Sequence, residues 1–263
     1  MAKLQTFDVI VIGSGSAGFS AAEAARAQGA SVCVIESNRL GGECPNDACV
    51  PSKALLKTAQ VYRSVQHARA FGIQPGSVSF AFSDLMKYRR DVVETITGGG
   101  PFGQRYQKLF HALGVVVKKG RAVFVEDEIV EVEGEHLRAR AFVIATGTED
   151  FIPPIPGIEK VKFLRWKEAL QLTRQPKSLA IIGGGPVGCE IAVFFATFGT
   201  RVVLLQSAPQ VLHREDPEIA LLAREALEFL KIEVVTNANV VEVMTGGSGV
   251  FGVHVDIGGN KKM

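Results

Sequence analysis

The chain has 263 residues, 47% of them hydrophobic and 21% charged, which is enough for two domains of ordinary size. Lys and Arg number 29 and Asp and Glu number 27, so the formal net charge of +2 argues against a nucleic-acid or membrane-surface partner. The uncharged stretch Val9–Ala22 is shorter than the roughly 18 residues of a membrane span, and Asp8 would interrupt the apolar core of a signal peptide. We therefore expect a cytoplasmic protein without a membrane-spanning segment.

The first predicted unit is a strand–helix–strand segment near the N-terminus. An apolar run, Val9–Ile12, predicts a buried parallel strand. A GxGxxG turn follows, and an Ala-rich helix then ends at Gly29, before a second apolar strand that closes at Glu36. This order is typical of a dinucleotide-binding βαβ unit, in which the glycines let a pyrophosphate approach the helix N-terminus.

Two of the four cysteines stand apart from the others. Cys33 and Cys189 lie in apolar or glycine-rich surroundings, and we interpret them as inert, packed thiols. Cys44 and Cys49 lie close together among turn residues in GGECPNDACVPSK, and no second ligand pair completes a zinc site. On a regular helix their Cα atoms would be about 8.6 Å apart, whereas a disulfide needs roughly 4.4–6.8 Å. A bond between them therefore requires a segment wound more tightly than a helix.

The middle of the chain predicts helices, then strands, then a boundary. Pro51–Phe71 and Ser83–Phe110 have helical patterns, the second interrupted by the glycines of Gly98–Pro101. Gly114–Gly147 alternates apolar and polar residues and predicts a β-meander that returns to a buried strand, FVIATG. The proline-rich segment Phe151–Gly157 predicts a domain boundary, so we divide the chain into residues 1–150 and 151–263.

An internal repeat organises the whole chain. Residues 178–206 repeat the plan of residues 8–36 at a constant offset of 170, glycine for glycine. Two such units in one chain predict two Rossmann-like nucleotide-binding domains of α/β class, each with a β-meander. Glu36 closes the first copy, where an acidic residue accepts hydrogen bonds from ribose hydroxyls. Gln206 closes the second and does not repel a 2′-phosphate, while Arg214 is eight residues further on, so the choice between NAD and NADP stays open.

The combination of these motifs resembles the class I pyridine nucleotide–disulfide oxidoreductases, which include dihydrolipoamide dehydrogenase, glutathione reductase and mercuric reductase. The segment GGECPNDACVPSK is similar to the family's GGTCxNxGCxPSK, and the similarity extends over GRA at Gly120–Ala122, ATG at Ala145–Gly147 and GGGPVGCE at Gly183–Glu190. The departures are Glu43 for the common Thr, and Asp47 and Ala48 before the second cysteine.

The resemblance implies FAD and NAD or NADP as cofactors, and a redox path through the cysteines. Cys49 would lie against the flavin and form the charge-transfer thiolate, and Cys44 would attack a disulfide or metal-ion substrate. Lys53 would pair with Glu190 near the flavin. The implied catalytic residues are Cys44, Cys49, Lys53 and Glu190. The implied FAD-site residues are Gly13, Ser14, Gly15, Ser16, Ala17, Gly18, Glu36, Gly42, Glu43, Cys44, Lys53, Gly120, Ala122, Ala145, Thr146 and Gly147. The implied nicotinamide-nucleotide residues are Gly183, Gly184, Gly185, Pro186, Val187, Gly188, Glu190, Gln206 and Val240.

The resemblance also implies parts that this sequence does not show. Family members continue with the end of the nucleotide domain and a dimerisation domain that carries a His–Glu pair, so we expect a chain truncated at the C-terminus whose full-length form is a homodimer. His213 and Glu218 copy the His–Glu spacing, but they follow the second Rossmann strand and we interpret them as unrelated to catalysis. We expect no metal site.

Two other functions remain open at this point. The chain alone could be a nucleotide-binding module without turnover because the C-terminal half is missing. A flavoprotein oxidase or monooxygenase with two Rossmann units is the third possibility, against which the cysteine pair argues. The electron acceptor stays undetermined among lipoamide, glutathione disulfide and Hg²⁺.

Overall fold

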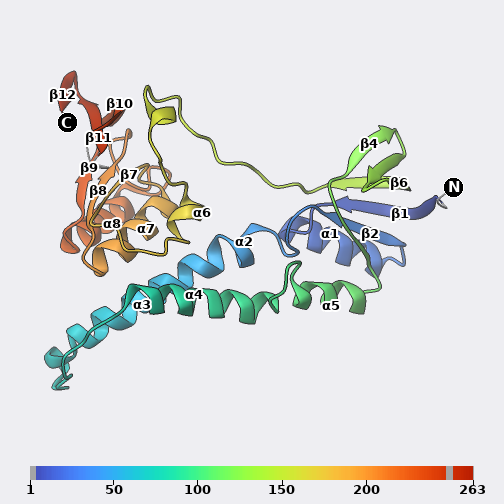
Figure 1. Ribbon diagram of the computed structural model, residues 1–263, viewed down its shortest axis with the longest axis horizontal. Helices are drawn as coiled ribbons and strands as arrows, with labels where there is room; N and C mark the ends of the chain where they lie inside the picture. Colours follow the sequence, from blue (N-terminus) through green and yellow to red (C-terminus); the bar gives the residue numbers. More distant parts are fainter. Residues whose placement is uncertain (1–3, 247–250, 263) are drawn as a thin grey trace. The chain divides into compact units, whose positions relative to one another are not determined.

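The computed structural model describes residues 4–246 and 251–262, which form two compact units (Figure 1). The first unit comprises residues 1–51 and 90–149, and the second comprises residues 52–89 and 150–263. One change of unit along the chain therefore falls after Glu149. The segment Ser52–Arg89, which the sequence-based division placed in the first domain, has most of its contacts in the second unit.

The first unit contains a six-stranded sheet in the order β3-β2-β1-β6-β5-β4. The four strands β3, β2, β1 and β6 run parallel, and β4 and β5 continue the sheet in antiparallel fashion. The bounds are β1 Gln5–Ile12, β2 Val32–Glu36, β3 Val116–Lys119, β4 Val123–Glu126, β5 Ile129–Val132 and β6 Glu135–Ile144.

Alternating side chains of the parallel strands build a core on each face of this sheet. Val11, Val32 and Val34 pack against the helices α1 (Ser16–Ala27) and α5 (Gln104–Ala112). Ile10 and Ile35, one position along the same strands, pack on the opposite face with residues of β5 and β6. Because successive side chains of a strand point to opposite faces, one face of the sheet is covered by helices and the other, in the described part of the chain, is not. The helix α1 begins after the carboxyl end of β1.

The predicted β-meander is correct only in its second part. The strands β4, β5 and β6 are antiparallel neighbours. The first strand, β3, instead pairs in parallel with β2, with Val116 opposite Cys33, because α5 precedes it and acts as a crossover helix. The predicted buried strand FVIATG ends at Ile144, which is 69% exposed, and its last three residues are not in the strand.

The predicted helices are present with shifted ends. The segment after the cysteines forms α3 (Cys49–Gln66), preceded by the short α2 (Glu43–Asn46) and followed by the 3₁₀ helix η1 (Ala68–Phe71). The second helical segment is two helices, α4 (Phe82–Thr97) and α5. They are separated by Gly98, Gly99 and Gly100, all at positive φ, where other residues would be strained.

The second unit repeats the strand–helix–strand plan. A parallel sheet in the order β7-β8-β9 is followed by an antiparallel meander, β10-β11-β12. The bounds are β7 Ser178–Ile182, α7 Pro186–Thr197, β8 Arg201–Leu205, α8 Pro217–Phe229, β9 Glu233–Val235, β10 Ala238–Thr245, β11 Phe251–Ile257 and β12 Asn260–Lys262. The observed α/β architecture, with a Rossmann-like βαβ unit in each half, agrees with the predicted class.

An aromatic core holds the second unit together. Phe194 and Phe195 on α7 are 1% exposed, and Phe198, three residues after Phe195, is the buried C-cap of that helix. Tyr62 of α3 lies 5.1 Å from Phe198 between ring centroids, and Phe82 of α4 lies 6.3 Å from Phe195. Each pair buries a large apolar area and adds roughly 0.5–1.5 kcal/mol from ring geometry. These contacts explain why the segment Ser52–Arg89 belongs to the second unit.

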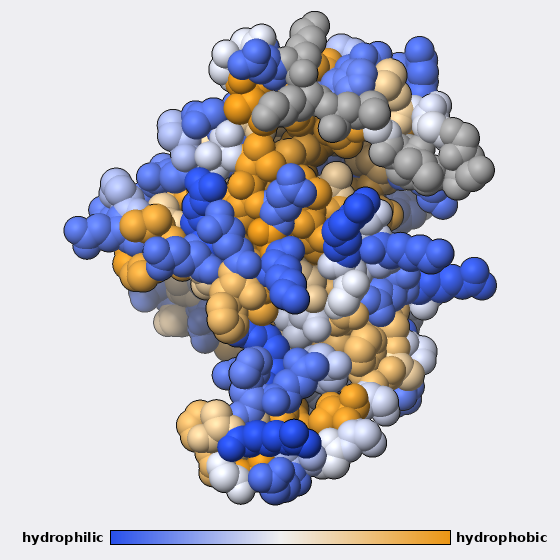
Figure 2. All heavy atoms as spheres, turned by 90° about the vertical axis from the view of Figure 1, so that its left-hand side faces the viewer, coloured by the Kyte–Doolittle hydropathy of each residue, from blue (hydrophilic) through white to orange (hydrophobic). Residues whose placement is uncertain are grey.

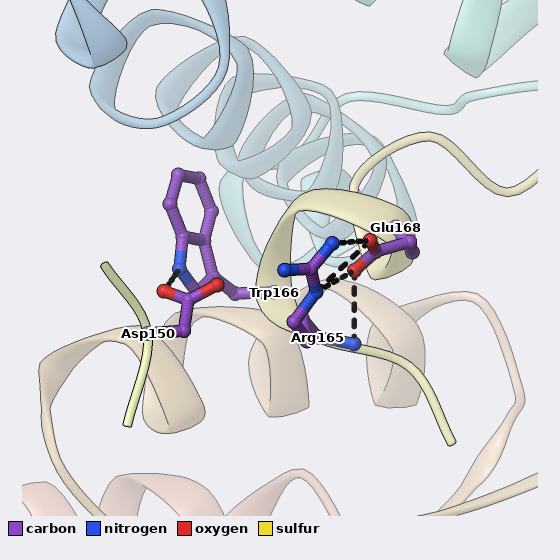
Figure 3. Close-up of polar contacts among 4 residues, drawn as sticks. All are labelled: Asp150, Arg165, Trp166 and Glu168. Atoms are coloured by element: carbon purple, nitrogen blue, oxygen red, sulfur yellow. Dashed lines mark hydrogen bonds and ion pairs between the residues drawn. The ribbon is translucent and has the colours of Figure 1, made fainter. Parts of the chain in front are cut away.

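Hydrogen bonds fix both ends of the connection that opens the second unit (Figure 3). Trp166, at the start of α6 (Trp166–Ala169), donates its indole N–H to Asp150 Oδ1 at 2.6 Å. Glu168 caps the same helix by accepting from the Arg165 backbone N–H at 3.0 Å, and its carboxylate also binds the Arg165 guanidinium. The hydrogen bonds from Arg165 lower the pKa of Glu168.

The surface shows apolar residues among charged ones (Figure 2). Ile219, Leu222 and Phe229 of α8 are more than half exposed. Within residues 4–246 and 251–262, no helix is long and apolar enough to cross a membrane.

Candidate functional site: two glycine-rich turns and a cysteine segment

The first glycine-rich turn connects β1 to α1 through very close backbone contacts. Gly13 has φ +102°, and a Cβ there would lie 2.2 Å from the carbonyl oxygen of Ala145. A Cβ on Gly18 would lie 1.9 Å from the carbonyl oxygen of Gly13. Both positions therefore require glycine, and the helix can begin directly at the end of the strand.

The carboxylate of Glu36 is oriented by this turn. Its Oε2 accepts from the Ser14 backbone N–H at 3.0 Å and from the Ser14 hydroxyl at 2.6 Å, and its Oε1 accepts from the Asn38 N–H at 2.8 Å. Glu36 is 9% exposed. A carboxylate has about four acceptor positions, so further hydroxyl donors can still bind to it.

The second turn reproduces these bonds at the same offset of 170. Gly13 N–H donates to Ile35 O at 2.8 Å, and Gly183 N–H donates to Leu205 O at 2.8 Å. The Gly184 N–H donates to Gln206 Oε1 at 3.1 Å, as Ser14 does to Glu36. The sequence repeat is thus also a repeat of hydrogen bonds, and Gln206 occupies the structural position of Glu36.

The loop after β8 folds back onto the second turn. Leu212 N–H donates to Gly184 O at 2.7 Å, and Gln206 Nε2 donates to Gln210 O at 3.3 Å. His213, two residues before the acidic–proline stretch that starts α8, is in this loop, and Glu218 is in the first turn of α8. The helix begins at Pro217.

The cysteine segment interrupts the helical path between α2 and α3. Cys44 lies in α2, Cys49 is the first residue of α3, and both are exposed thiols. The break lies at Asp47 and Ala48, where both backbone N–H groups donate to Glu43 O, at 2.8 and 2.9 Å. The segment is therefore not one regular helix.

The cysteine segment is joined to the first glycine-rich turn by another close approach. Gly42 has φ +72°, and a Cβ there would lie 2.6 Å from Gly15 Cα. Gly15 is the N-cap of α1 and has no side chain to cap the helix. The N–H groups of the first helical turn and the cysteine segment thus lie next to one another.

The sequence did not reveal two residues that hold or contact this segment and the turn before it. Asn46, treated only as a turn residue, is 4% exposed and donates from Nδ2 to Leu40 O at 3.0 Å and Gly42 O at 2.8 Å. Its place in the family motif was the only sequence signal. Tyr106 of α5 contacts the Gly41 position, where a Cβ would lie 2.6 Å from the ring. No local pattern marks Tyr106, because it is more than 60 residues away in the sequence.

Burial raises the pKa of the Tyr106 phenol, and negative charge on Cys44 raises it further. The phenol is therefore protonated near neutral pH. It stands within electrostatic range of the Cys44 sulfur, where an O–H group can stabilise a thiolate.

The second unit contains the ion pair that the resemblance implies. Lys53 Nζ lies 2.6 Å from Glu190 Oε1. The side chains are 61% and 26% exposed, respectively. A pair this exposed contributes only about 0–1 kcal/mol to stability. Its presence is therefore not explained by stability alone.

The other predicted residues have mainly packing contacts here. Gly120 has φ +144°, and a Cβ would lie 2.6 Å from the Val132 side chain. Ala122 packs on the core that contains Val132, and Val240 packs with Leu205 and Val255. Thr146 and Gly147 are exposed directly after β6.

We predict that thiol alkylation separates the four cysteines into two classes. Burial raises the pKa of Cys33 to about 12 and that of Cys189 to about 11. At pH 8 only about a thousandth or less of each is then thiolate, the reactive form. Iodoacetamide under native conditions should modify the exposed Cys44 and Cys49 first, as peptide mass spectrometry would show. Equal labelling of Cys33 would contradict this assignment.

The residues present fit a dinucleotide in each half. The backbone packs closely at Gly13, Gly18 and Gly42, and no side chain caps the N-terminus of α1. The backbone N–H groups of the first helical turn can therefore bind a pyrophosphate. Gly185 is likewise the uncapped N-cap of α7. Glu36 and Gln206 stand at the ends of the second strands, where ribose hydroxyls are bound in such folds.

The comparison with protein families shows to which family the chain belongs. Residues 7–262 match the model of the family described as pyridine nucleotide-disulphide oxidoreductase. The chain belongs to this family. FAD and NAD(P)H are the cofactors of pyridine nucleotide-disulphide oxidoreductases.

Individual members of the family agree with this assignment. The chain is 34% identical over 257 residues to a mercuric reductase from Bacillus cereus, covering 98% of this chain and 40% of that protein. It is 35% identical over 239 residues to a dihydrolipoyl dehydrogenase from Bacillus subtilis, covering 89% and 51%. The solved HOCl-induced flavoprotein disulfide reductase RclA from Escherichia coli matches with a TM-score of 0.78 and 27% identity, covering 97% of this chain and 54% of that one. The chain spans about half the length of these relatives.

Proposed function

We propose that the chain is the nucleotide-binding and redox-active part of an FAD-dependent NAD(P)H:disulfide oxidoreductase. The observation that carries the proposal is the placement of Cys44 and Cys49 on either side of a helix break, on a segment that packs against the first glycine-rich turn. Family membership supports the same chemistry. The few cysteines fit a reducing compartment such as the cytoplasm.

In this proposal residues 1–150 hold FAD and residues 151–263 hold the nicotinamide nucleotide. The N–H groups at Ser16, Ala17 and Gly18 would bind the FAD pyrophosphate, and Glu36 would accept from the ribose of its adenosine half. Gly185, Val187 and Gly188 would do the same for the nicotinamide nucleotide, with Gln206 at its ribose. Bound FAD would supply the chemistry that links a hydride from the nicotinamide nucleotide to the two-electron reduction of a disulfide.

The cysteines then perform the thiol chemistry. Two electrons and two protons convert the Cys44–Cys49 disulfide to two thiols while NAD(P)H and a proton become NAD(P)⁺. The Cys44 thiolate attacks the acceptor disulfide, forming a mixed disulfide and releasing one thiol. Cys49 then attacks Cys44, which re-forms the internal disulfide and releases the second thiol. Tyr106 would stabilise the Cys44 thiolate by donating its proton in a hydrogen bond.

Lys53 and Glu190 would position the hydride-transfer site in this scheme. The 2.6 Å ion pair joins α3, which begins at Cys49, to α7, which begins at the second glycine-rich turn. Because the ion pair is exposed, removing either charge lowers the stability of the chain only slightly. A large effect on reduction by NAD(P)H would therefore report function.

The acceptor is proposed as a small-molecule disulfide or a metal ion, because the relatives include mercuric reductases and dihydrolipoyl dehydrogenases. A homodimer is proposed for the full-length protein.

An anaerobic absorption spectrum tests the proposed function. The chain is loaded with FAD and titrated with NADH or NADPH. We expect bound FAD and, after reduction, a long-wavelength charge-transfer band that disappears in Cys49→Ser. FAD bound without the band, with the same spectrum in Cys49→Ser, would contradict the proposal. Binding of nucleotide without any reduction would identify a binding module without turnover.

We predict that Gln206→Glu lowers the affinity for NADPH relative to NADH by about tenfold or more. The carboxylate can keep the bond from Gly184 N–H, which spans 3.1 Å in this structure, but it adds a negative charge beside the ribose. Like charges in such a site cost a few kcal/mol. Isothermal titration with both nucleotides measures the ratio, with Gln171→Glu, at an exposed position of the same unit, as the matched charge control. An unchanged ratio would remove Gln206 from the ribose site.

A further inference from the structure

The side chain of Asn46 bridges two backbone carbonyl groups of the turn before the cysteines. Its Nδ2 donates to Leu40 O at 3.0 Å and to Gly42 O at 2.8 Å, and the residue is 4% exposed. Asn46 ends α2, two residues after Cys44 and three before Cys49. Its carboxamide therefore holds the end of α2, with Cys44, against the backbone turn at Leu40–Gly42.

The same turn is bonded to the first dinucleotide turn. Gly41 N–H donates to the Ser14 hydroxyl at 3.1 Å, and that hydroxyl donates to Glu36 Oε2 at 2.6 Å. Gly42 also approaches Gly15 too closely to admit a Cβ. The bonds of Asn46 thus attach α2 to a backbone turn that is itself fixed on the body of the first unit.

The other half of the Asn46 carboxamide has no partner. Its Oδ1 is buried and accepts no hydrogen bond from the residues that the structure describes. Burying such an acceptor costs about 1–3 kcal/mol. The two bonds donated by Nδ2 offset this cost and attach the end of α2 to the Leu40–Gly42 turn.

We propose that Asn46 is the positioning residue of the redox pair, which sets how readily Cys44 and Cys49 close into a disulfide. This inference rests on the proposed function, because it presumes that the pair cycles. Closing the disulfide restricts the segment from Cys44 to Cys49. Because the Nδ2 bonds already fix the part of this segment that carries Cys44, less conformational entropy is lost on closure. Without them, the dithiol state gains freedom and closure becomes less favourable.

The equilibrium of the pair with glutathione tests this role. In the exchange, the two thiols are oxidised to the disulfide while glutathione disulfide is reduced to two glutathione molecules. For Asn46→Ala we expect the equilibrium constant for closure to fall about tenfold, which makes the reduction potential about 30 mV less negative. Asn46→Asp keeps the size but loses the donor, and we expect the same direction of change. Asn38→Ala, at an exposed asparagine nearby, should stay within about twofold of the unsubstituted chain.

Alkylation and peptide mass spectrometry of the complete chain give the closed fraction, and circular dichroism shows whether each variant is folded. Folded Asn46 variants with an unchanged closure constant would overturn the inference. If neither variant folds, hydrogen exchange of the side-chain amides in the unsubstituted chain decides. Slow exchange of the Asn46 Nδ2 protons supports the positioning role of Asn46, and exchange as fast as at Asn38 overturns it. If the unsubstituted chain forms no Cys44–Cys49 disulfide in any glutathione buffer, the proposed function itself fails.

Discussion

Replacing Cys44 with serine is expected to lower the reduction of any disulfide acceptor by at least about a thousandfold, the scale of removing a covalent nucleophile. A serine hydroxyl stays protonated at neutral pH and cannot form the internal disulfide. Cys49→Ser should fail differently. Cys44, exposed on α2, still attacks the acceptor, but nothing then releases it, so a mixed disulfide accumulates.

Mass spectrometry of the intact chain after incubation with glutathione disulfide distinguishes these failures. Cys49→Ser should carry one glutathione on Cys44, whereas any glutathione on Cys44→Ser should lie on the exposed Cys49. Cys189→Ser is the matched control, because burial raises the pKa of Cys189 to about 11 and keeps it protonated. Full activity in Cys44→Ser, or loss of activity in Cys189→Ser, would show that the reactive thiol lies elsewhere.

Gly18→Ala should both destabilise the first unit and abolish its FAD binding. The added Cβ would lie 1.9 Å from the carbonyl oxygen of Gly13 and 2.9 Å from its carbon, so the helix must move away from the strand. Overpacking of this kind costs about 3 kcal/mol. The same shift would withdraw the N–H groups that we propose for the pyrophosphate. Gly188→Ala, where the Cβ would lie 2.0 Å from Gly183 O, should do the same to the second unit.

Gly29→Ala is the control for this substitution. Gly29 also has a positive φ, +82°, but a Cβ there meets no atom within 4 Å. Only the backbone conformation is then penalised, by about 1–2 kcal/mol, and FAD should stay bound. Urea unfolding and the amount of FAD retained after gel filtration measure both effects. If Gly18→Ala retained FAD as well as Gly29→Ala, the first turn would not be the FAD site.

The parts of the fold that the sequence predicted are those governed by local patterns. The two βαβ units follow from apolar runs, glycine spacing and a constant offset, and the structure repeats even the bond from residue 14 to residue 36 between residues 184 and 206. The turn residues between the cysteines predict an irregular backbone, but Pro45 and Asn46 lie in α2 and the break comes after them, at Asp47 and Ala48.

The parts that the sequence did not predict depend on long-range contacts. The strand β3 alternates like a meander strand, but the preceding α5 carries it to the far side of β2. The segment Ser52–Arg89 belongs to the second unit because Tyr62 and Phe82 pack on α7. Asn46 and Tyr106 acquire their roles from the turn at Leu40–Gly42, a placement that no periodic pattern encodes.

Counting thiols after the chain has oxidised a nicotinamide nucleotide tests most directly whether the electrons reach the Cys44–Cys49 pair. The oxidised chain is loaded with FAD, given a limiting amount of NADH or NADPH without oxygen, and alkylated after unfolding. We expect two new thiols for each nucleotide oxidised, one on Cys44 and one on Cys49, while Cys33 and Cys189 stay thiols throughout. Oxidation of the nucleotide without new thiols on this pair would contradict it.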